Sequence, residues 1–516
     1  MNFLKTFFSL SFTTLISRIL GFLRDLTIAH IFGVSIYTDA FFIAFKIPNL
    51  LRRLFFEGAF YQAFIPILIY YKSNKKTKKI QDFISSISGL IFIILFILII
   101  LGIIFSDYLI KISAPGFIKI SDQFELSCIL LKIMFPYLLL VSLSSLYSSI
   151  LNSWNYFSIP AFSSSILNCT IIFFSICFND YFQPSIIILA WAVIISGLLQ
   201  LIYQFPYLLK INMLVFPRIN LKNSGLIKVI KKIGPSLLGS TANQISLILN
   251  SIFSSLLNTG SISWMYYADR LVEFPIGILG VSLSTILFTS LSKSYSKNNM
   301  IEFNKLINLG FKIGLIISLP ISVILFILSK PLIEILFKYG KFTNFDVLMT
   351  QKALELYSIG LVSFILIKIL SSAFYASQKV NIPMKISLFT LLILQILNPC
   401  LIFYYQHAGL ALSFSISGWI NLFLIFWILH QKKMISLNFN IFIFIFRLFI
   451  ALSCMTLTLI FMLYFIPLHN INSFFTKIVS LFTILFTIGI VYLISLYFLK
   501  ISFINDIYSI KNSKKN

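Results

Sequence analysis

The sequence KIPNLLRRLFFEG, residues 46–58, places four charged side chains between two apolar segments. TDAFFIAF (38–45) precedes it and AFYQAFIPIL (59–68) follows it, so the charges interrupt what otherwise has the composition of a membrane helix. This stretch is either a loop or part of a helix that carries charge inside a bilayer. The rest of the chain decides between these two alternatives.

The composition is that of a membrane protein. Of the 516 residues, 59% are hydrophobic and 11% are charged, whereas a soluble protein has about 25% charged residues. Apolar segments of about twenty residues recur along the chain, and each is long enough to cross about 30 Å of hydrocarbon. The net charge of +25 comes mostly from lysines in short loops, which argues against a nucleic-acid-binding face. We predict an all-α polytopic membrane protein without a separate soluble domain.

Fourteen spans account for the apolar segments. Residues 1–25 lack a small-residue cleavage site and contain Arg18 and Arg24, so we expect a membrane helix there rather than a cleaved signal peptide. The second span includes residues 46–58, which are therefore interpreted as helix. The predicted ranges are 7–31, 38–70, 82–106, 125–151, 159–178, 185–208, 233–257, 264–290, 309–329, 348–375, 384–404, 408–429, 441–466 and 476–499.

The basic residues of the connections predict the orientation. The even-numbered connections carry most of them, as in KSNKKTKK (72–79) and at Lys432 and Lys433, and the tail KNSKKN falls on the same side. The odd-numbered connections have only scattered lysines. By the positive-inside rule we predict that both termini and the even-numbered connections are cytoplasmic.

The two halves of the sequence resemble each other at a constant offset. SSILNSWNYFSIP (148–160) aligns with SSAFYASQKVNIP (371–383), and with a small shift Gly33 and Pro48 fall on Gly260 and Pro275. We predict two pseudo-symmetric six-helix lobes, followed by two C-terminal helices and a tail; the ranges are 1–210, 211–432 and 433–516. Transporters with such repeats bind substrate between the repeats and work by alternating access.

Charged residues concentrate on the first, second and eighth spans. A charge facing lipid at the bilayer centre costs about 2.5–3.5 kcal/mol, so eleven would cost on the order of 30 kcal/mol, beyond a stability of roughly 5–15 kcal/mol. They must line a hydrated cavity or pair with each other. The eleven, with Ser17 on the same helix face as Arg24, are Arg18, Arg24, Asp25, Asp39, Lys46, Arg52, Arg53, Glu57, Asp269, Arg270 and Glu273.

Arginine dominates this set and indicates the kind of substrate. Five of the seven arginines of the chain belong to it, and the guanidinium group suits bidentate binding of phosphate oxygens. Asp39, Lys46 and Arg53 recur every seven residues and so share one helix face. We predict a cavity for an anionic, phosphate-bearing substrate.

A purely structural role is the alternative. The charges would then be ion pairs that fix helix register, for example Asp25 with Arg18 or Arg24. Pro48 and Pro275 each remove a backbone donor and allow a bend, but such bends suit any membrane bundle. Both interpretations stay open from the residues alone.

Motifs for an ATP-driven engine or a metal site are missing from the sequence. It contains no GxxxxGK[ST] and no HExxH, and its five cysteines lie in apolar runs without CxxC spacing, which predicts small buried side chains. We expect no catalytic site, no metal and no cofactor. The membrane potential or an ion gradient would drive transport, since one charge moved across 100 mV is worth about 2.3 kcal/mol.

Four segments resemble one transporter family. SRILGFLRD (17–25), TDAFFIAFKIPNLLRRLFFEGAFYQAFIPIL (38–68), LNSWNYFSIPAF (151–162) and SWMYYADRLVEFPIGILGVSLSTILFTSLS (263–292) are similar to the MurJ (MviN) lipid II flippases, of the multidrug, oligosaccharidyl-lipid and polysaccharide exporter superfamily. The resemblance runs over nearly the whole chain. It implies two six-helix lobes and a final helix pair in the bacterial inner membrane.

The resemblance also implies the substrate. This is lipid II, the undecaprenyl-pyrophosphate-linked disaccharide-pentapeptide, moved from the cytoplasmic to the outer leaflet for peptidoglycan synthesis. Membrane lipids and other cell-wall synthesis proteins would be its further partners, with no nucleic acid, and the last two helices would form a groove for the polyprenyl tail. Important family residues match Arg18, Arg24, Asp25, Asp39, Arg52, Glu57 and Arg270, to which we add Ser17, Lys46, Arg53, Asp269 and Glu273.

Two other functions fit the sequence less well. Another exporter of the superfamily would move a different lipid-linked glycan or a drug, but a cationic drug calls for an acidic cavity rather than an arginine-rich one. A non-transport envelope scaffold would carry its charges in loops, and the sequence carries them inside helices.

Overall fold

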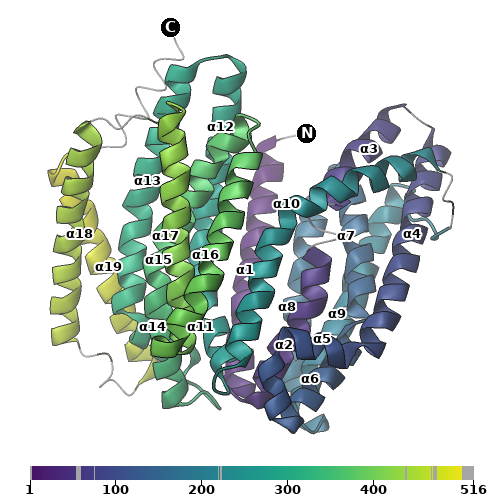
Figure 1. The fold of residues 1–516 in the computed structure, drawn as a ribbon, viewed down its shortest axis with the longest axis horizontal. Helices are drawn as coiled ribbons and strands as arrows, with labels where there is room; N and C mark the ends of the chain where they lie inside the picture. Colours follow the sequence, from purple (N-terminus) through teal and green to yellow (C-terminus); the bar gives the residue numbers. More distant parts are fainter. Residues whose placement is uncertain are drawn as a thin grey trace. The chain divides into compact units, whose positions relative to one another are not determined.

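The computed structural model describes residues 3–53, 60–74, 76–218, 220, 223–435, 439–466, 468 and 473–501, and this part is helical without a strand (Figure 1). The prediction of an all-α membrane protein is confirmed. The helices of the first half are α1 (Phe3–Phe32), α2 (Ile36–Arg52), α3 (Phe60–Asn74), α4 (Thr77–Ile104), α5 (Ser106–Ser113), α6 (Ser121–Met134), α7 (Tyr137–Ser153), α8 (Ser158–Cys177), α9 (Ile187–Lys210) and α10 (Ser224–Ser255).

The second half of the described chain is helical as well. Its helices are α11 (Ser261–Pro275), α12 (Val281–Ser296), α13 (Met300–Ile327), α14 (Ser329–Phe337), α15 (Asn344–Ala376), α16 (Asn381–Tyr405), α17 (His407–Gln431), α18 (Phe439–Phe465) and α19 (Phe474–Phe498). Short 3-10 helices cover Pro115–Lys119 and Asn179–Tyr181.

The internal repeat of the sequence is also present in the helix boundaries. The offset that separates segments 148–160 and 371–383 also separates the first residues of α4 and α13, and it separates their last residues. At the same offset, α15 covers the positions of α6 and α7 together. The backbone agrees as well, because Asn155 and Gln378, a further pair at this offset, both have positive φ, at 67° and 59°. Gly33 and Gly260, matched with a small shift, have φ of 64° and 93°, which favours glycine.

The predicted spans outnumber the long apolar helices. Eleven helical segments within the described residues are long and apolar enough to cross a membrane, and two of them join consecutive helices, α6 with α7 and α11 with α12. The other three predicted spans fall on α1, on α2 and α3, and on α10. The junction of α2 and α3, residues 54–59, lies outside the described residues. Fourteen therefore stays a prediction.

The helices form two compact units. The first contains residues 1–263 and 339–343, and the second contains 264–338 and 344–516. In the first unit α1 packs on α8 and α10 packs on α3, while in the second unit α15 packs on α17, α13 and α12. The predicted division at residues 210 and 432 stays a prediction.

The two prolines lie at different kinds of helix position. Pro48 is buried inside α2, which continues to Arg52. Pro275 ends α11, and a π-helical turn, Ile276–Gly280, leads into α12. A proline cannot donate the helical hydrogen bond, and a π turn is one way in which a helix accommodates such a defect. The helix thus accommodates Pro275 with a π turn, and a bend at either proline stays a prediction.

The prediction for the cysteines is largely wrong. Cys128 is buried, but Cys169, Cys177, Cys400 and Cys454 lie exposed on helix surfaces. An apolar residue of a membrane helix is stable when it faces lipid, so an apolar run does not indicate burial inside the protein.

Candidate functional site

Arg24 of α1 contacts partners on its own helix and on a neighbouring one. Its Nη2 and Nε donate to Asp25 Oδ1 at 2.6 and 3.0 Å, and its Nη1 donates to Asn168 Oδ1 of α8 at 3.1 Å. Arg24 is 7% exposed and Asp25 1%. Of the two pairings expected for Asp25, with Arg18 or with Arg24, the structure shows the one with Arg24.

Helix α8 holds the same segment of α1 at two further points. Asn168 Nδ2 donates to the carbonyl oxygen of Ser17 at 3.2 Å, and the hydroxyls of Ser17 and Ser164 lie 2.9 Å apart. Gly21 lies against the same side chain, since a Cβ there would be at the van der Waals distance of 3.4 Å from Asn168 Nδ2. Arg18 is half-buried on the same helix.

Asp39 lies at the start of α2 and is 1% exposed. A capping box of Ser35 and Thr38 fixes this first turn. The Asp39 carboxylate accepts from the backbone N–H of Gly260 at 2.6 Å and of Ser263 at 2.9 Å, and also from the Ser263 hydroxyl. Asp39 thus holds residues 260–263 beside α2, and its predicted place in a cavity stays a prediction.

The charges farther along α2 lie in different surroundings. Lys46 Nζ donates to the hydroxyl of Ser251, a residue of α10, at 2.6 Å. Arg52 is half-buried and its Nε donates to Asn49 Oδ1 at 3.3 Å, while Arg53 is exposed. Glu57 lies outside the described residues.

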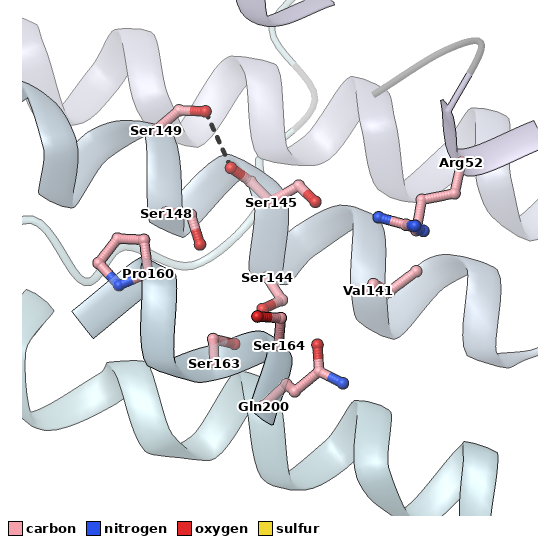
Figure 2. Close-up of a pocket in the computed structure, with 10 residues that line it drawn as sticks. All are labelled: Arg52, Val141, Ser144, Ser145, Ser148, Ser149, Pro160, Ser163, Ser164 and Gln200. Carbon is pink, nitrogen blue, oxygen red and sulfur yellow. Dashed lines mark hydrogen bonds between the residues drawn. The ribbon is translucent and has the colours of Figure 1, made fainter. Parts of the chain in front are cut away.

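Arg52 borders a polar cavity of about 330 Å³ in the first unit. Figure 2 shows its guanidinium directed toward the serine-bearing face of α7. Arg24, Asp25 and Asn168 form a cluster, called here the Arg24 cluster. Because Ser164 of α8 lines this cavity and also contacts Ser17 of α1, the cavity and the Arg24 cluster involve the same two helices. Its lining residues are Arg52, Val141, Ser144, Ser145, Ser148, Ser149, Pro160, Ser163, Ser164 and Gln200.

Two glutamines of α9 belong to one side of this cavity: Gln200 lines it, and Gln204 bonds to two serines that line it. Gln204 is fully buried, and its Nε2 donates to Ser144 of α7 at 2.6 Å and to Ser163 of α8 at 3.3 Å, so it joins three helices. Gln200 is 5% exposed, and its Nε2 has no hydrogen-bond partner within the described residues. An orphaned buried donor costs free energy, and a ligand acceptor would satisfy it.

The second unit holds the remaining predicted residues. Arg270 Nη1 lies 2.9 Å from Glu273 Oε2, its Nη2 donates to the Tyr266 hydroxyl at 3.1 Å, and its guanidinium lies over the Tyr266 ring. Asp269, half-buried, precedes it on the same helix. The three charges lie within α11, and their convergence with those of the first unit stays a prediction.

Several polar residues that the structure brings to these sites were not predicted. Asn168, Ser251 and Gln200 carry no charge and lie in apolar runs, so only their polarity inside a span could have indicated them.

Glu355 lies inside the predicted span 348–375, where it accepts from Ser329 at 3.1 Å and from Gln351 at 2.7 Å. Its position inside a span was a usable signal.

Comparisons with known proteins agree on one family. The model of the family "Lipid II flippase MurJ" matches residues 28–481. A probable lipid II flippase MurJ of Buchnera aphidicola subsp. Schizaphis graminum is 67% identical over 505 residues, which cover 98% of either chain.

Solved structures show a related fold. A lipid II flippase MurJ in an inward closed conformation has a TM-score of 0.79 at 29% identity and covers 95% of this chain and 98% of that one. An inward-facing multidrug resistance MATE family transporter of the MOP superfamily has a TM-score of 0.66 at 13% identity, over 81% of this chain and 94% of that one. The second likeness concerns the fold alone.

Proposed function

Because this chain belongs to the MurJ family of lipid II flippases, we propose that it moves lipid II from the cytoplasmic to the outer leaflet of the bacterial inner membrane. The chain is a multi-pass membrane protein, and it would supply the peptidoglycan precursor for cell wall biogenesis by alternating access. Membrane lipids and other cell-wall synthesis proteins would be its further partners.

The cavity beside Arg52 is the observation that carries the proposal. It combines a guanidinium group with serine hydroxyls and the Gln200 amide, whose Nε2 has no partner in the described part of the chain. A guanidinium binds pyrophosphate oxygens in a bidentate manner, and hydroxyl and amide groups suit a sugar-peptide head. Arg24 does not line this cavity, but it donates to Asn168 of α8, the helix that contributes Ser163 and Ser164 to the wall.

Acidic partners would hold the arginines while the cavity is empty. Arg24 with Asp25 and Arg270 with Glu273 are such pairs. At Arg270 a pyrophosphate that displaces the Glu273 carboxylate replaces one charge-assisted pair by another, and the released carboxylate is exposed to solvent. The buried Asp25 carboxylate would stay paired with Arg24. The proposed cavity set is Ser17, Arg18, Arg24, Asp25, Asp39, Lys46, Arg52, Arg53, Glu57, Asp269, Arg270 and Glu273.

Within that set Asp39 would position rather than bind. Its two carboxylate oxygens already accept from the backbone at residues 260 and 263, and it is almost fully buried. Helices α18 and α19 would accommodate the polyprenyl tail, since both expose large apolar side chains such as Phe449 and Phe482. The membrane potential or an ion gradient would supply the energy, without a cofactor or a catalytic site, and both termini would be cytoplasmic.

A leaflet-specific assay of lipid II tests this function. Cells depleted of their own flippase receive this chain, its Arg52→Ala variant or Lys119→Ala, which removes an exposed charge outside the cavity. We expect the chain and Lys119→Ala to restore lipid II in the outer leaflet, and Arg52→Ala to fail at equal expression. Absence of lipid II from the outer leaflet with the unaltered, expressed chain would refute the proposal.

A further inference from the structure

A second polar cavity of about 330 Å³ lies in the first unit and shares no lining residue with the Arg52 cavity. The end of α3, the first turns of α4, the start of α10 and the connection between α9 and α10 form its walls. It has no role in the transport proposed above. Its lining residues are Tyr71, Lys79, Asp82, Ser85, Ser86, Arg218, Asn220, Asn223 and Ser224.

Close backbone contacts fix the walls of this cavity. The N–H of Arg218 donates to the carbonyl oxygen of Ser85 at 3.1 Å, and the Ser85 hydroxyl donates to the carbonyl oxygen of Phe216 at 2.6 Å. Gly89 permits the approach, because a Cβ there would lie 2.2 Å from the Arg218 carbonyl oxygen. The connection is thus bound to α4 by contacts of its main chain, which leaves the Arg218 side chain available to the cavity.

The start of α10 closes the other side. Asn223 caps this helix, since its side chain accepts from the Gly225 N–H at 2.9 Å and also donates to Ser86 at 3.4 Å. The hydroxyls of Tyr71 and Ser224 lie 3.3 Å apart and join α3 to α10. The cavity is therefore lined by polar groups from four separate segments.

The charges of the cavity suit a monoanion. Lys79 and Arg218 are exposed, and neither forms an ion pair with any residue that the structure describes. Asp82 also lines the cavity, so two cations and one carboxylate leave one net positive charge. A phosphodiester carries one negative charge, and the Asp82 carboxylate can accept from a hydroxyl group of the same ligand.

The surroundings of the cavity are those of a membrane boundary. Helix α4 is one of the spans, and Lys79 and Asp82 lie in its first two turns. Ile69 on α3 and Ile227 and Ile230 on α10 expose apolar side chains on the helices that line the cavity. Basic pockets between membrane helices bind lipid head groups, while apolar helix faces contact the acyl chains.

We propose that this cavity binds the head group of an anionic phospholipid whose phosphodiester is esterified to a hydroxyl-bearing alcohol, as in phosphatidylglycerol. Arg218 and Lys79 hold the phosphate, and Asp82 accepts from the alcohol. The bound lipid ties the connection between α9 and α10 to α4. The site lies in the leaflet in which α4 begins.

Lipid binding to the purified full chain in detergent tests the site. Native mass spectrometry would count bound phosphatidylglycerol and, in parallel, bound phosphatidylethanolamine, whose head group is zwitterionic. We expect phosphatidylglycerol to bind more tightly, and the Lys79→Gln/Arg218→Gln double variant to lose about tenfold in that affinity, equivalent to about 1.4 kcal/mol. Lys119→Gln/Lys330→Gln removes two exposed charges elsewhere and should retain it.

Three outcomes would overturn the proposal. They are equal affinity for the two lipids, unchanged phosphatidylglycerol affinity in the Lys79→Gln/Arg218→Gln variant, and displacement of the lipid by millimolar inorganic phosphate, which would make the site one for free phosphate. A melting curve without added lipid checks that the variants fold. If the double variant does not purify, Arg218→Gln alone should lose about threefold in phosphatidylglycerol affinity. Asp82→Asn, whose amide oxygen can still accept from the alcohol, should not weaken phosphatidylglycerol binding.

Discussion

Arg24 and Arg270 are both arginines beside an acidic partner, but the protein holds them differently. Arg24 is nearly buried and is fixed by its neighbour Asp25 and, across a helix interface, by Asn168. The Arg270 side chain is 33% exposed, and it contacts Glu273 and Tyr266 of its own helix. Arg24 therefore contributes to the packing of α1 on α8, whereas solvent reaches Arg270 and can replace its carboxylate partner at lower cost.

This difference separates two roles that sequence alone had left as alternatives. A buried pair fixes helix register and is costly to break from one side, while an exposed pair contributes little to stability. The Arg24 cluster thus has a structural function whether or not it binds cargo. Substitution of Arg24 should therefore lower both stability and transport, whereas substitution of Arg270 should lower transport with little change in stability.

Arg24→Ala should have the largest effect. It leaves the buried Asp25 carboxylate without its arginine partner, which costs about 3–5 kcal/mol in unfolding free energy. We expect a large drop in the melting temperature of the purified protein together with loss of complementation of a flippase-depleted strain. Arg24→Leu combined with Asp25→Leu should recover part of the stability but not the growth; a double variant as unstable as Arg24→Ala would contradict the pairing.

Asn168→Leu should have an intermediate effect. It removes the acceptor of Arg24 and the donor to the Ser17 carbonyl, and unsatisfied buried groups cost about 1–3 kcal/mol. Thermal melting measures the change. Asn421→Leu, which breaks a 3.0 Å bond to Thr390 in the second unit, is a matched control and should leave transport intact. Equal transport by the two variants would show that Asn168 has no role in holding Arg24 for function.

Arg270→Ala should abolish growth with little change in stability. The pair with Glu273 is exposed, so we expect a change within about 0.5 kcal/mol in the melting assay. Arg270→Lys keeps the charge but loses the bidentate geometry and should support only weak growth. Wild-type growth of Arg270→Ala would exclude this residue from the cavity.

Glu273→Gln should have the smallest effect. The side chain is 56% exposed and serves, in our proposal, only to hold Arg270 between transport cycles. We expect unchanged melting and growth close to that of the unaltered chain. A growth defect as severe as that of Arg270→Ala would mean that Glu273 acts on the cargo or on a coupling ion itself.

The fold was largely predictable from the sequence because membrane helices follow apolar length and a duplicated chain keeps its boundaries. The internal repeat was visible in SSILNSWNYFSIP, and the structure extends it to helix ends and to the positive φ of Asn155 and Gln378. Charges inside spans were equally visible, since each is costly in lipid.

The arrangement around those charges was not predictable. Asn168, Ser251 and Gln204 act through geometry between distant helices, and nothing in their local sequence distinguishes them from other polar residues of an apolar run. Helical periodicity gave Asp39 and Lys46 one shared face, but it could not show that Asp39 would accept from main-chain N–H groups. Contacts of this kind depend on which helices become neighbours.

The carboxylate of Asp39 has a consequence for the synthesis of the protein. Its acceptor contacts to Gly260 and Ser263 span 221 and 224 residues of chain, so they can form only after the chain has been synthesised through these positions. At roughly 5–20 residues per second, α2 waits on the order of ten to forty seconds for these partners. During that interval the charge must stay in contact with water or with the insertion machinery, which makes the N-terminal part of α2 a slow-maturing segment during membrane insertion.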